Sequence, residues 1–169
     1  EGLTFTPVDA ADAISLGVVT VHQSIDDGVI PDLDVANNLM LDRLVGAKAG
    51  FFVREKDMRA QAQLVAASMG IEVDLTARVA DLSVADRQMI AIARAMARSP
   101  KILILDEPTS SLSASEAKRL FALVDRLKEQ GVAILYISHR MSDIRRIADR
   151  ILCMRDGAIA GSFEDAPLD

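Results

Sequence analysis

The chain is poor in cysteine and in aromatic residues, so disulfides and aromatic packing contribute little to its stability. Its 169 residues include a single cysteine, no tryptophan and only 4% aromatic residues. One cysteine, Cys153, excludes an internal disulfide and is consistent with a reducing cytoplasm. Because half of the residues are hydrophobic, we expect an aliphatic core in one domain, large enough to bury about 70% of the unfolded surface.

Several functional signals are also missing. No apolar run approaches the roughly 20 residues of a membrane span, and the first ten residues, EGLTFTPVDA, do not resemble a signal peptide. A net charge of −6 and a pI near 4.9 argue against a nucleic-acid groove, which would need a basic stripe. The phosphate-binding motif G-x-x-x-x-G-K-[ST] does not occur in the sequence.

The strongest signal for chemistry is KILILDEPTSSLS, from Lys101 to Ser113. Its apolar residues 102–105 predict a short strand buried on both faces. The strand ends in Asp106 and Glu107, followed by Pro108, which has no N–H to continue a ladder. Two carboxylates at the carboxyl end of a buried strand are typical of an α/β active site. Taken alone, the pattern is equally compatible with two solvated turn residues.

The remaining chain alternates between strand and helix patterns after a polar, irregular start at residues 1–13. Asp34, Ser83 and the Ser113–Glu116 capping box predict helix starts, and Gly70 predicts a left-handed C-terminal cap. Strands are expected at 18–22, 102–105, 132–137, 151–154 and 158–163, and helices from near 34 and at 54–69, 84–98, 114–130 and 142–148. Alternation from residue 101 onward predicts a mostly parallel sheet with right-handed crossovers.

Three segments in this order resemble ABC ATPases: LSVADRQ at 82–88, LILDEPTSSLS at 103–113 and YISHR at 136–140. The resemblance covers nearly all of the chain. It implies an α/β fold of the P-loop NTPase type, with a mostly parallel sheet, an inserted helical subdomain and an N-terminal truncation. The whole chain, 1–169, would be a partial ABC ATPase domain. Residues 32–98 would form the helical subdomain, and 14–31 with 99–169 the RecA-like core.

The resemblance assigns roles to four residues at strand ends. Asp106 matches the Walker B aspartate that holds Mg²⁺, and Glu107 matches the catalytic glutamate that orients the attacking water. Gln23 matches the Q-loop glutamine near the metal and the water, in the loop that senses the transmembrane partner. His139 matches the switch histidine that contacts the γ-phosphate. The cofactors implied are ATP and Mg²⁺. Taken alone, a histidine after a strand is more often an ordinary surface residue.

The segment Ser83, Val84, Ala85, Asp86 matches the ABC signature, which binds ATP held by an opposing cassette. A helix N-terminus suits this task because its free N–H groups attract phosphate. Val84 and Ala85 replace the family's usual glycines. Asp86 replaces glutamine and places a negative charge near the phosphate, which is tolerable if Asp86 caps the N–H of Ser83. The alternative is an ordinary capped helix.

The D-loop and the flanking motifs narrow the resemblance further. Ser111 and Ser113 belong to the D-loop and are assigned to the nucleotide site, although many members have aspartate in place of Ser113. The segments LSVADRQM, DEPTSSLS, ISHRMSDI and MRDG look like the first of two tandem cassettes in bacterial carbohydrate importers. Such a protein would lie on the cytoplasmic side of the inner membrane, with transmembrane permease subunits, a second cassette and, indirectly, a sugar-binding protein as partners. Segment 32–81 would dock the permease.

Two other functions stay open at this point. One is a non-catalytic interaction module that kept the cassette shell without its phosphate loop. The other is a soluble ABC ATPase of DNA repair or translation, which the acidic charge and DEPTSSLS disfavour.

The resemblance also raises a question about the sheet. In the family, the strand that feeds the phosphate loop lies between the strands matching 132–137 and 151–154. Without it, these two strands must close up, leave a gap or accept a strand from another chain, because unpaired backbone groups are costly when buried. We expect self-association or rearrangement there.

Overall fold

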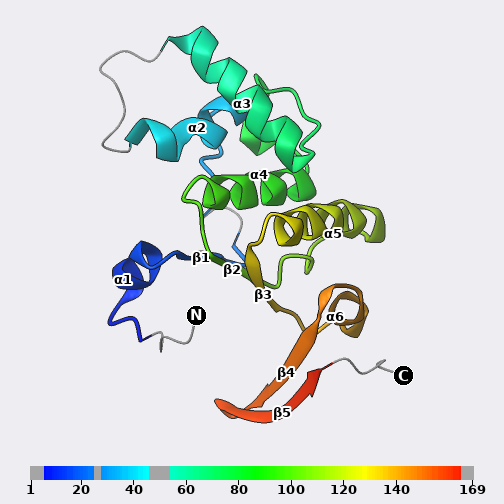
Figure 1. Cartoon of the computed structure of the whole chain (residues 1–169). Helices are drawn as coiled ribbons and strands as arrows, with labels where there is room; N and C mark the ends of the chain where they lie inside the picture. Colours follow the sequence, from blue (N-terminus) through cyan, green and yellow to red (C-terminus); the bar gives the residue numbers. More distant parts are fainter. Residues whose placement is uncertain (1–5, 25–27, 46–53, 165–169) are drawn as a thin grey trace.

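The computed structural model describes residues 6–24, 28–45 and 54–164, and the account below is limited to them (Figure 1). The elements follow in this order: α1 (Ala10–Ser15), β1 (Val18–Val21), α2 (Val35–Val45), α3 (Glu55–Met69), the 3₁₀ turn η2 (Val79–Asp81), α4 (Val84–Met96), β2 (Ile102–Asp106), α5 (Ala114–Glu129), β3 (Ala133–Ile137), α6 (Met141–Ile147), β4 (Arg150–Arg155) and β5 (Ala158–Glu164). The predicted alternation is confirmed, except that α1, which starts after its N-cap Asp9, occupies part of the segment expected to be irregular.

The predicted parallel sheet is present and has three strands in the order β1-β2-β3. Leu105 at its centre lies beside Val21 of β1 and Tyr136 of β3. Because all three strands run in the same direction, their carboxyl ends meet at one edge of the sheet. The residues after each strand are therefore brought together at that edge.

Local capping signals explain most of the element boundaries. The Asp34 carboxylate accepts from the N–H of Asn37 at 2.7 Å, and Gly70 ends α3 in the left-handed region at φ 67°. Ser113 and Glu116 form the complete predicted capping box at the start of α5. These interactions involve residues close in the sequence, and for that reason the pattern predicts them well.

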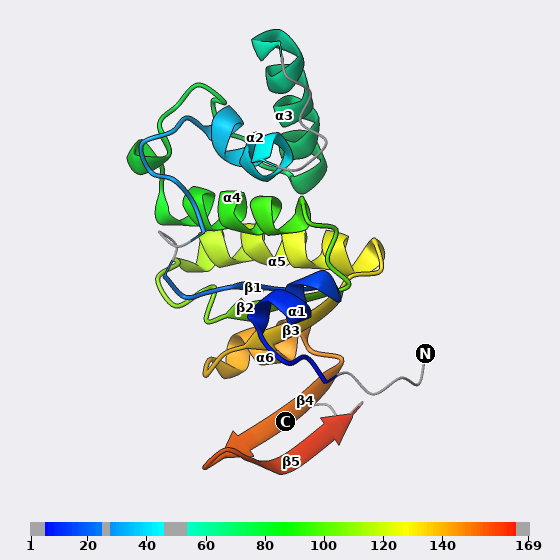
Figure 2. The same ribbon diagram turned by 90° about the vertical axis from the view of Figure 1, so that its left-hand side faces the viewer.

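Helices α4 and α5 cover one face of the sheet (Figure 2). The main hydrophobic core is aliphatic, as expected, and includes residues of this face, of both helices and of α2. The largest fully buried hydrophobic side chains are Leu39, Ile90, Ile92, Leu103, Leu105, Leu120, Leu123 and Leu127, with Val35, Val79 and Val124. None of the described helices has the length and hydrophobicity that a membrane span requires.

The prediction that the strand at 102–105 is buried on both faces is only half right. Leu103 and Leu105 are fully buried against α4 and α5, whereas Ile102 and Ile104 on the other face are partly exposed. None of the longer described helices covers that side: the short α6 lies below it, and the short α1 lies beside β1 (Figure 2). Two short helices leave part of the face uncovered, so the side chains alternate in burial along the strand.

The expectation that the strand at 151–154 joins the parallel sheet is wrong. In the structure β4 pairs only with β5, in a separate antiparallel hairpin that projects away from the sheet (Figure 1). The outer edge of β3 has no partner strand among the described residues, and Leu135 and Ile137 on it are 48% and 44% exposed. Of the three outcomes considered, the structure therefore shows a gap between β3 and β4, with no strand between them among the described residues. Self-association stays a prediction.

Candidate functional site

Four predicted site residues lie at the carboxyl edge of the parallel sheet. Gln23 follows β1, Asp106 ends β2, Glu107 comes directly after it, and His139 follows β3. Asp106 is in register with Ile137, so Glu107 and His139 begin neighbouring loops. The topology thus places these side chains on one edge, as parallel strands require.

Glu107 and His139 are in direct contact. The N–H of Glu107 donates to the Ile137 carbonyl at 3.0 Å, which extends the β2–β3 ladder by one bond. The Glu107 Oε1 atom accepts from the His139 backbone N–H at 3.1 Å. It also lies 2.7 Å from His139 Nδ1. The carboxylate therefore has a fixed direction before any ligand arrives.

The backbone of Glu107 is strained. Its φ is +48°, in the left-handed region that costs a non-glycine residue roughly 1 kcal/mol or more. The N–H of Ser110 donates to the Glu107 carbonyl at 3.1 Å and closes a tight turn after the strand. This turn directs the carboxylate toward His139 and away from the direction that a regular strand would have given it.

The two Glu107 oxygens have different environments. The Glu107 side chain is 17% exposed, against 77% for His139. While Oε1 is held by His139, Oε2 is buried and has no hydrogen-bond partner among the described residues. A buried acceptor without a partner is costly, and such atoms commonly mark the place where a water or an ion binds. Glu107 is therefore the strongest candidate for a functional residue at this edge.

Asp106 and Gln23 lie beside this pair without a described side-chain contact to it. Asp106 is partly buried, and Gln23 is exposed. The described residues contain no group of three or more histidine, cysteine or acidic side chains that could hold a metal. Mg²⁺ usually keeps several waters and binds through one or two carboxylates plus substrate phosphates. The Asp106 carboxylate, which is partly buried and adjacent to Glu107 in the chain, fits a Mg²⁺ held in this way. The predicted loop residues 25–27 after Gln23 lie outside the described residues.

A buried polar cluster, missed by the sequence analysis, lies behind the edge. Its members are Thr109, Tyr136 and Asp143, with Arg140 at its border. Asp143 is 2% exposed and Thr109 is fully buried. Burial and the Asp143 charge raise the pKa of Tyr136 to about 12, although the hydrogen bond with Thr109 and the charge of Arg140 act in the opposite direction. The sequence gives no local pattern that would indicate a buried Asp143, so an exposed position on a helix would be expected from it.

At the signature segment, the structure corrects the expected role of Asp86. The Asp86 carboxylate does accept a hydrogen bond from Ser83, but from its hydroxyl, at 2.7 Å. Its other oxygen accepts from Arg119 of α5 at 2.8 Å. The charge of Asp86 is thus balanced by an arginine 33 positions away. A phosphate approaching the N-terminus of α4 would meet a neutral pair.

The remaining signature and D-loop residues are placed as follows. Ser83 is the N-cap of α4 and Ala85 is buried in the core, so Val84 and Ala85 offer backbone N–H groups rather than side chains. Ser111 is exposed in the turn before α5. The Ser113 hydroxyl donates to Glu116 Oε2, and the hydrogen bonds from the Ser113 hydroxyl and backbone N–H lower the pKa of the Glu116 carboxyl. Ser113 therefore serves the helix start in this structure.

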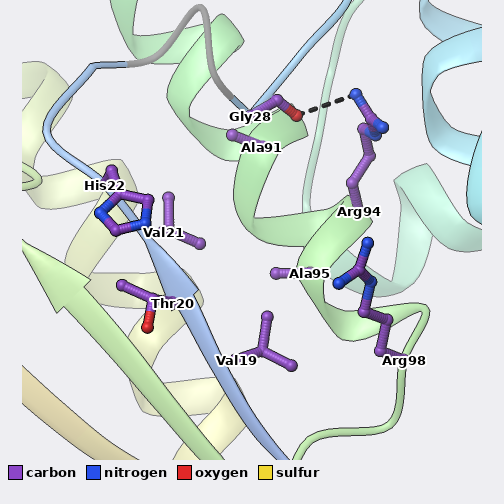
Figure 3. Close-up of a pocket in the computed structure, with 9 residues that line it drawn as sticks. All are labelled: Val19, Thr20, Val21, His22, Gly28, Ala91, Arg94, Ala95 and Arg98. Carbon is purple, nitrogen blue, oxygen red and sulfur yellow. Dashed lines mark hydrogen bonds between the residues drawn. The ribbon is translucent and has the colours of Figure 1, made fainter. Parts of the chain in front are cut away.

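A cavity of about 190 Å³ lies between β1 and α4 (Figure 3). Val19 and Val21 face it from β1, and Ala91 and Ala95 from α4. Arg94 borders it and donates to the Gly28 carbonyl at 2.9 Å. Small-molecule sites are usually larger, from about 300 Å³ upward. The cavity is therefore a packing feature beside the site rather than a nucleotide pocket.

Comparison with known proteins identifies the family of this chain. Residues 4–110 match the family described as ABC transporter. The arabinose import ATP-binding protein AraG of Rhizobium meliloti is 44% identical over 154 residues, which are 91% of this chain and 30% of that protein. The ribose import ATP-binding protein RbsA of Corynebacterium glutamicum is 43% identical over 157 residues, which are 93% of this chain and 29% of that protein. The chain thus spans about 30% of the length of these relatives.

Solved structures share the fold. One is cbiO1 from Clostridium perfringens, part of the ABC transporter complex cbiONQ, with a TM-score of 0.75 and 21% identity over 91% of this chain and 60% of that one. Another is the dimeric post-hydrolysis state of the ATP-binding cassette MJ0796 bound to ADP and Pi, with a TM-score of 0.74 and 22% identity over 92% of this chain and 67% of that one. At this identity they establish the α/β architecture and the parallel sheet.

Proposed function

Because this chain belongs to the ABC transporter family, we propose that it is part of an ATP-hydrolysing subunit that drives sugar import. The observation that carries the proposal is the contact between Glu107 and His139 at the carboxyl edge of the sheet. It is supported by relatives named for arabinose and ribose import. The sequence holds no phosphate-binding loop, so the proposal requires one from elsewhere in the full-length protein.

In this proposal Glu107 is the catalytic residue that orients the attacking water and accepts its proton. The backbone strain and the contact with His139 orient the carboxylate in advance, so little reorganisation is needed when ATP binds. The buried Oε2 is the atom available to the water. A carboxylate held in this way is a suitable general base.

His139 contacts the γ-phosphate in this proposal. Its imidazole is largely exposed and is held by only one oxygen of Glu107, so it can turn toward a phosphate while its backbone N–H keeps Glu107 in place. The hydrogen bond from the His139 backbone N–H keeps the two residues in contact when the ring turns away.

Asp106 and Gln23 would complete the cation site. The Asp106 carboxylate would hold Mg²⁺, in part through water, and Gln23 would approach it from the neighbouring strand. The ion would supply positive charge to the β- and γ-phosphates during transfer. The partial burial of Asp106 and the position of Gln23 on the same edge support these roles.

Ser83, Val84 and Ala85 would bind the γ-phosphate of ATP held by a second cassette. Arg119 supports this role, because its contact with Asp86 compensates the charge that would otherwise repel the phosphate. Ser111 and Ser113 would lie near the same nucleotide. Helices α2 and α3, with the 3₁₀ turn that follows, would contact the permease subunits. The subunit would sit peripherally on the cytoplasmic face of the inner membrane, with a sugar-binding protein as an indirect partner.

Reconstitution of the full-length protein with its permease in vesicles would test this function. We expect ATP-dependent uptake of a sugar, with arabinose and ribose as the first candidates. ATP hydrolysis without any sugar uptake would refute the transport role. Absence of both from a folded preparation would favour a non-catalytic interaction module.

A further inference from the structure

A buried polar cluster joins the loop after Glu107 to the helix after His139. Thr109 lies two residues beyond Glu107, and Asp143 lies four residues beyond His139. Both are almost completely buried, at 0% and 2% exposure. The cluster therefore connects, inside the protein, the same two segments whose functional side chains meet at its surface.

Two kinds of bond hold Thr109. Its hydroxyl donates to the Asp143 Oδ2 atom, and its carbonyl accepts from Arg140 Nη1 at 2.8 Å. The Tyr136 hydroxyl lies 3.3 Å from Thr109 Oγ1 and 3.4 Å from Asp143 Oδ2. The side chain and main chain of Thr109 are thus both attached to residues that flank His139.

Packing alone does not explain this arrangement. A buried carboxylate is costly unless it is hydrogen-bonded, and an apolar pair would fill the same space without that cost. Asp143 meets the requirement with hydroxyls from Thr109, Tyr136 and Ser142, the last at 3.1 Å. A network that needs every partner in place fixes geometry more strictly than apolar contacts do.

The turn that starts at Glu107 needs such an anchor. Between Glu107 and Leu112 it is closed by its own bonds, Ser110 to Glu107 and Leu112 to Thr109. Its first residue has a strained backbone, which persists only where the surroundings impose it. The ladder bond from Glu107 to Ile137 holds one end of the turn. The bond between Thr109 and Asp143 holds its middle.

We propose that Thr109 and Asp143, assisted by Tyr136, are positioning residues that hold the Glu107 carboxylate and the His139 imidazole at hydrogen-bond distance. Their loss lowers the rate of hydrolysis and leaves the affinity for ATP nearly unchanged. The effect on hydrolysis rests on the proposed function, whereas the positioning of Glu107 and His139 concerns this chain alone.

The first test measures the Glu107–His139 contact directly. The chain has only two histidines, His22 and His139, so the imidazole ¹⁵N resonances are readily assigned by NMR. In Thr109→Val and Asp143→Asn we expect the His139 Nδ1 resonance to move toward its position in Glu107→Gln. Thr109→Ser keeps the hydroxyl and should retain the wild-type resonance.

A matched control uses Asp125, another acidic residue that contacts the α6 region. Its carboxylate lies 2.5 Å from Arg146 Nη2 in a partly exposed pair between α5 and α6. Asp125→Asn should leave the His139 resonance unchanged. If Asp143→Asn fails to fold, Tyr136→Phe removes one hydroxyl only and should produce a smaller shift in the same direction. A folded Thr109→Val variant with the wild-type His139 resonance would overturn the proposal.

The second test measures hydrolysis in the full-length protein. We expect Thr109→Val and Asp143→Asn to lower kcat by about tenfold or more, because small misplacements of a catalytic group are costly. KM for ATP should stay within about twofold, and Thr109→Ser should recover most of kcat. A rise in KM with kcat unchanged would contradict positioning. If the wild-type protein does not hydrolyse ATP, the proposed function fails, and the imidazole resonance still decides whether the cluster holds Glu107 and His139 together.

Discussion

The Oε1 atom of Glu107 contacts two nitrogens of His139: it accepts a hydrogen bond from the backbone N–H at 3.1 Å and lies 2.7 Å from the ring Nδ1. One oxygen of the carboxylate therefore contacts the neighbouring loop, whereas the other is buried and has no hydrogen-bond partner among the described residues. This division of the carboxylate is the basis of the first prediction.

Glu107→Gln in the full-length protein should reduce ATP hydrolysis by at least about 100-fold, since the amide is a far poorer proton acceptor. ATP binding should be retained, because the side chain keeps its shape and loses a negative charge beside the triphosphate. Steady-state hydrolysis and nucleotide retention measure the two effects. Glu129→Gln, on the exposed end of α5, is the control and should hydrolyse ATP normally. Hydrolysis near the wild-type rate in Glu107→Gln would remove Glu107 from the catalytic role.

Tyr136 should ionise only at strongly alkaline pH. The pKa of its phenol is raised from 10.0 to about 12 by burial, with a further contribution from the Asp143 charge. Since it is the only tyrosine and the chain has no tryptophan, absorbance at alkaline pH reports it alone. The urea-unfolded chain should titrate near the ordinary value of about 10.

The sign of the effect on stability follows from this shift. The folded state favours the protonated phenol, so its contribution to stability is complete below pH 10 and is lost as the pH rises toward 12. Asp143→Asn should lower the Tyr136 pKa, because it removes a negative charge that disfavours the phenolate. A midpoint near 10 in a chain that circular dichroism shows to be folded would contradict the burial of this residue.

Arg119→Gln should impair ATP hydrolysis without a large effect on folding. The Asp86 carboxylate would lose its positively charged partner and repel a phosphate at the start of α4. An ion pair with this exposure contributes only about 0.2–1 kcal/mol to stability. The KM for ATP in the full-length protein should rise. The double variant Arg119→Gln with Asp86→Asn should recover most of the loss. If the double variant is no better than Arg119→Gln, the arginine does not act through Asp86.

The 169-residue chain by itself should bind MgATP only at millimolar concentrations or weaker, equivalent to about −4 kcal/mol at best. Its sequence has no phosphate-binding loop, and Asp106 and Glu107 are two neighbouring anions that only Mg²⁺ can offset. Titration calorimetry at physiological salt measures this affinity. A dissociation constant in the low micromolar range would mean that another part of the chain binds the phosphates.

The sequence by itself determined the features that depend on near neighbours. The capping box of Ser113 and Glu116, the left-handed end of α3 at Gly70 and the cap of α4 at Ser83 all form between residues within one helical turn of each other. The motif around Asp106 and Glu107 also indicated the edge of the sheet at which the predicted site residues lie. Such signals can be read from a chain because their interactions are formed locally, whatever the rest of the fold does.

Tertiary structure alone decided the features that join distant parts of the chain. The contact between Asp86 and Arg119 spans 33 positions, and the one between Thr109 and Asp143 spans 34. The burial of Asp143, the separation of the β4–β5 hairpin from the parallel sheet and the exposed face of Ile102 and Ile104 belong to the same group. Each depends on which elements pack together and in what register. A carboxylate on a short helix reads as solvated until the opposing loop supplies its hydrogen-bond donors, and only the folded chain brings that loop to it.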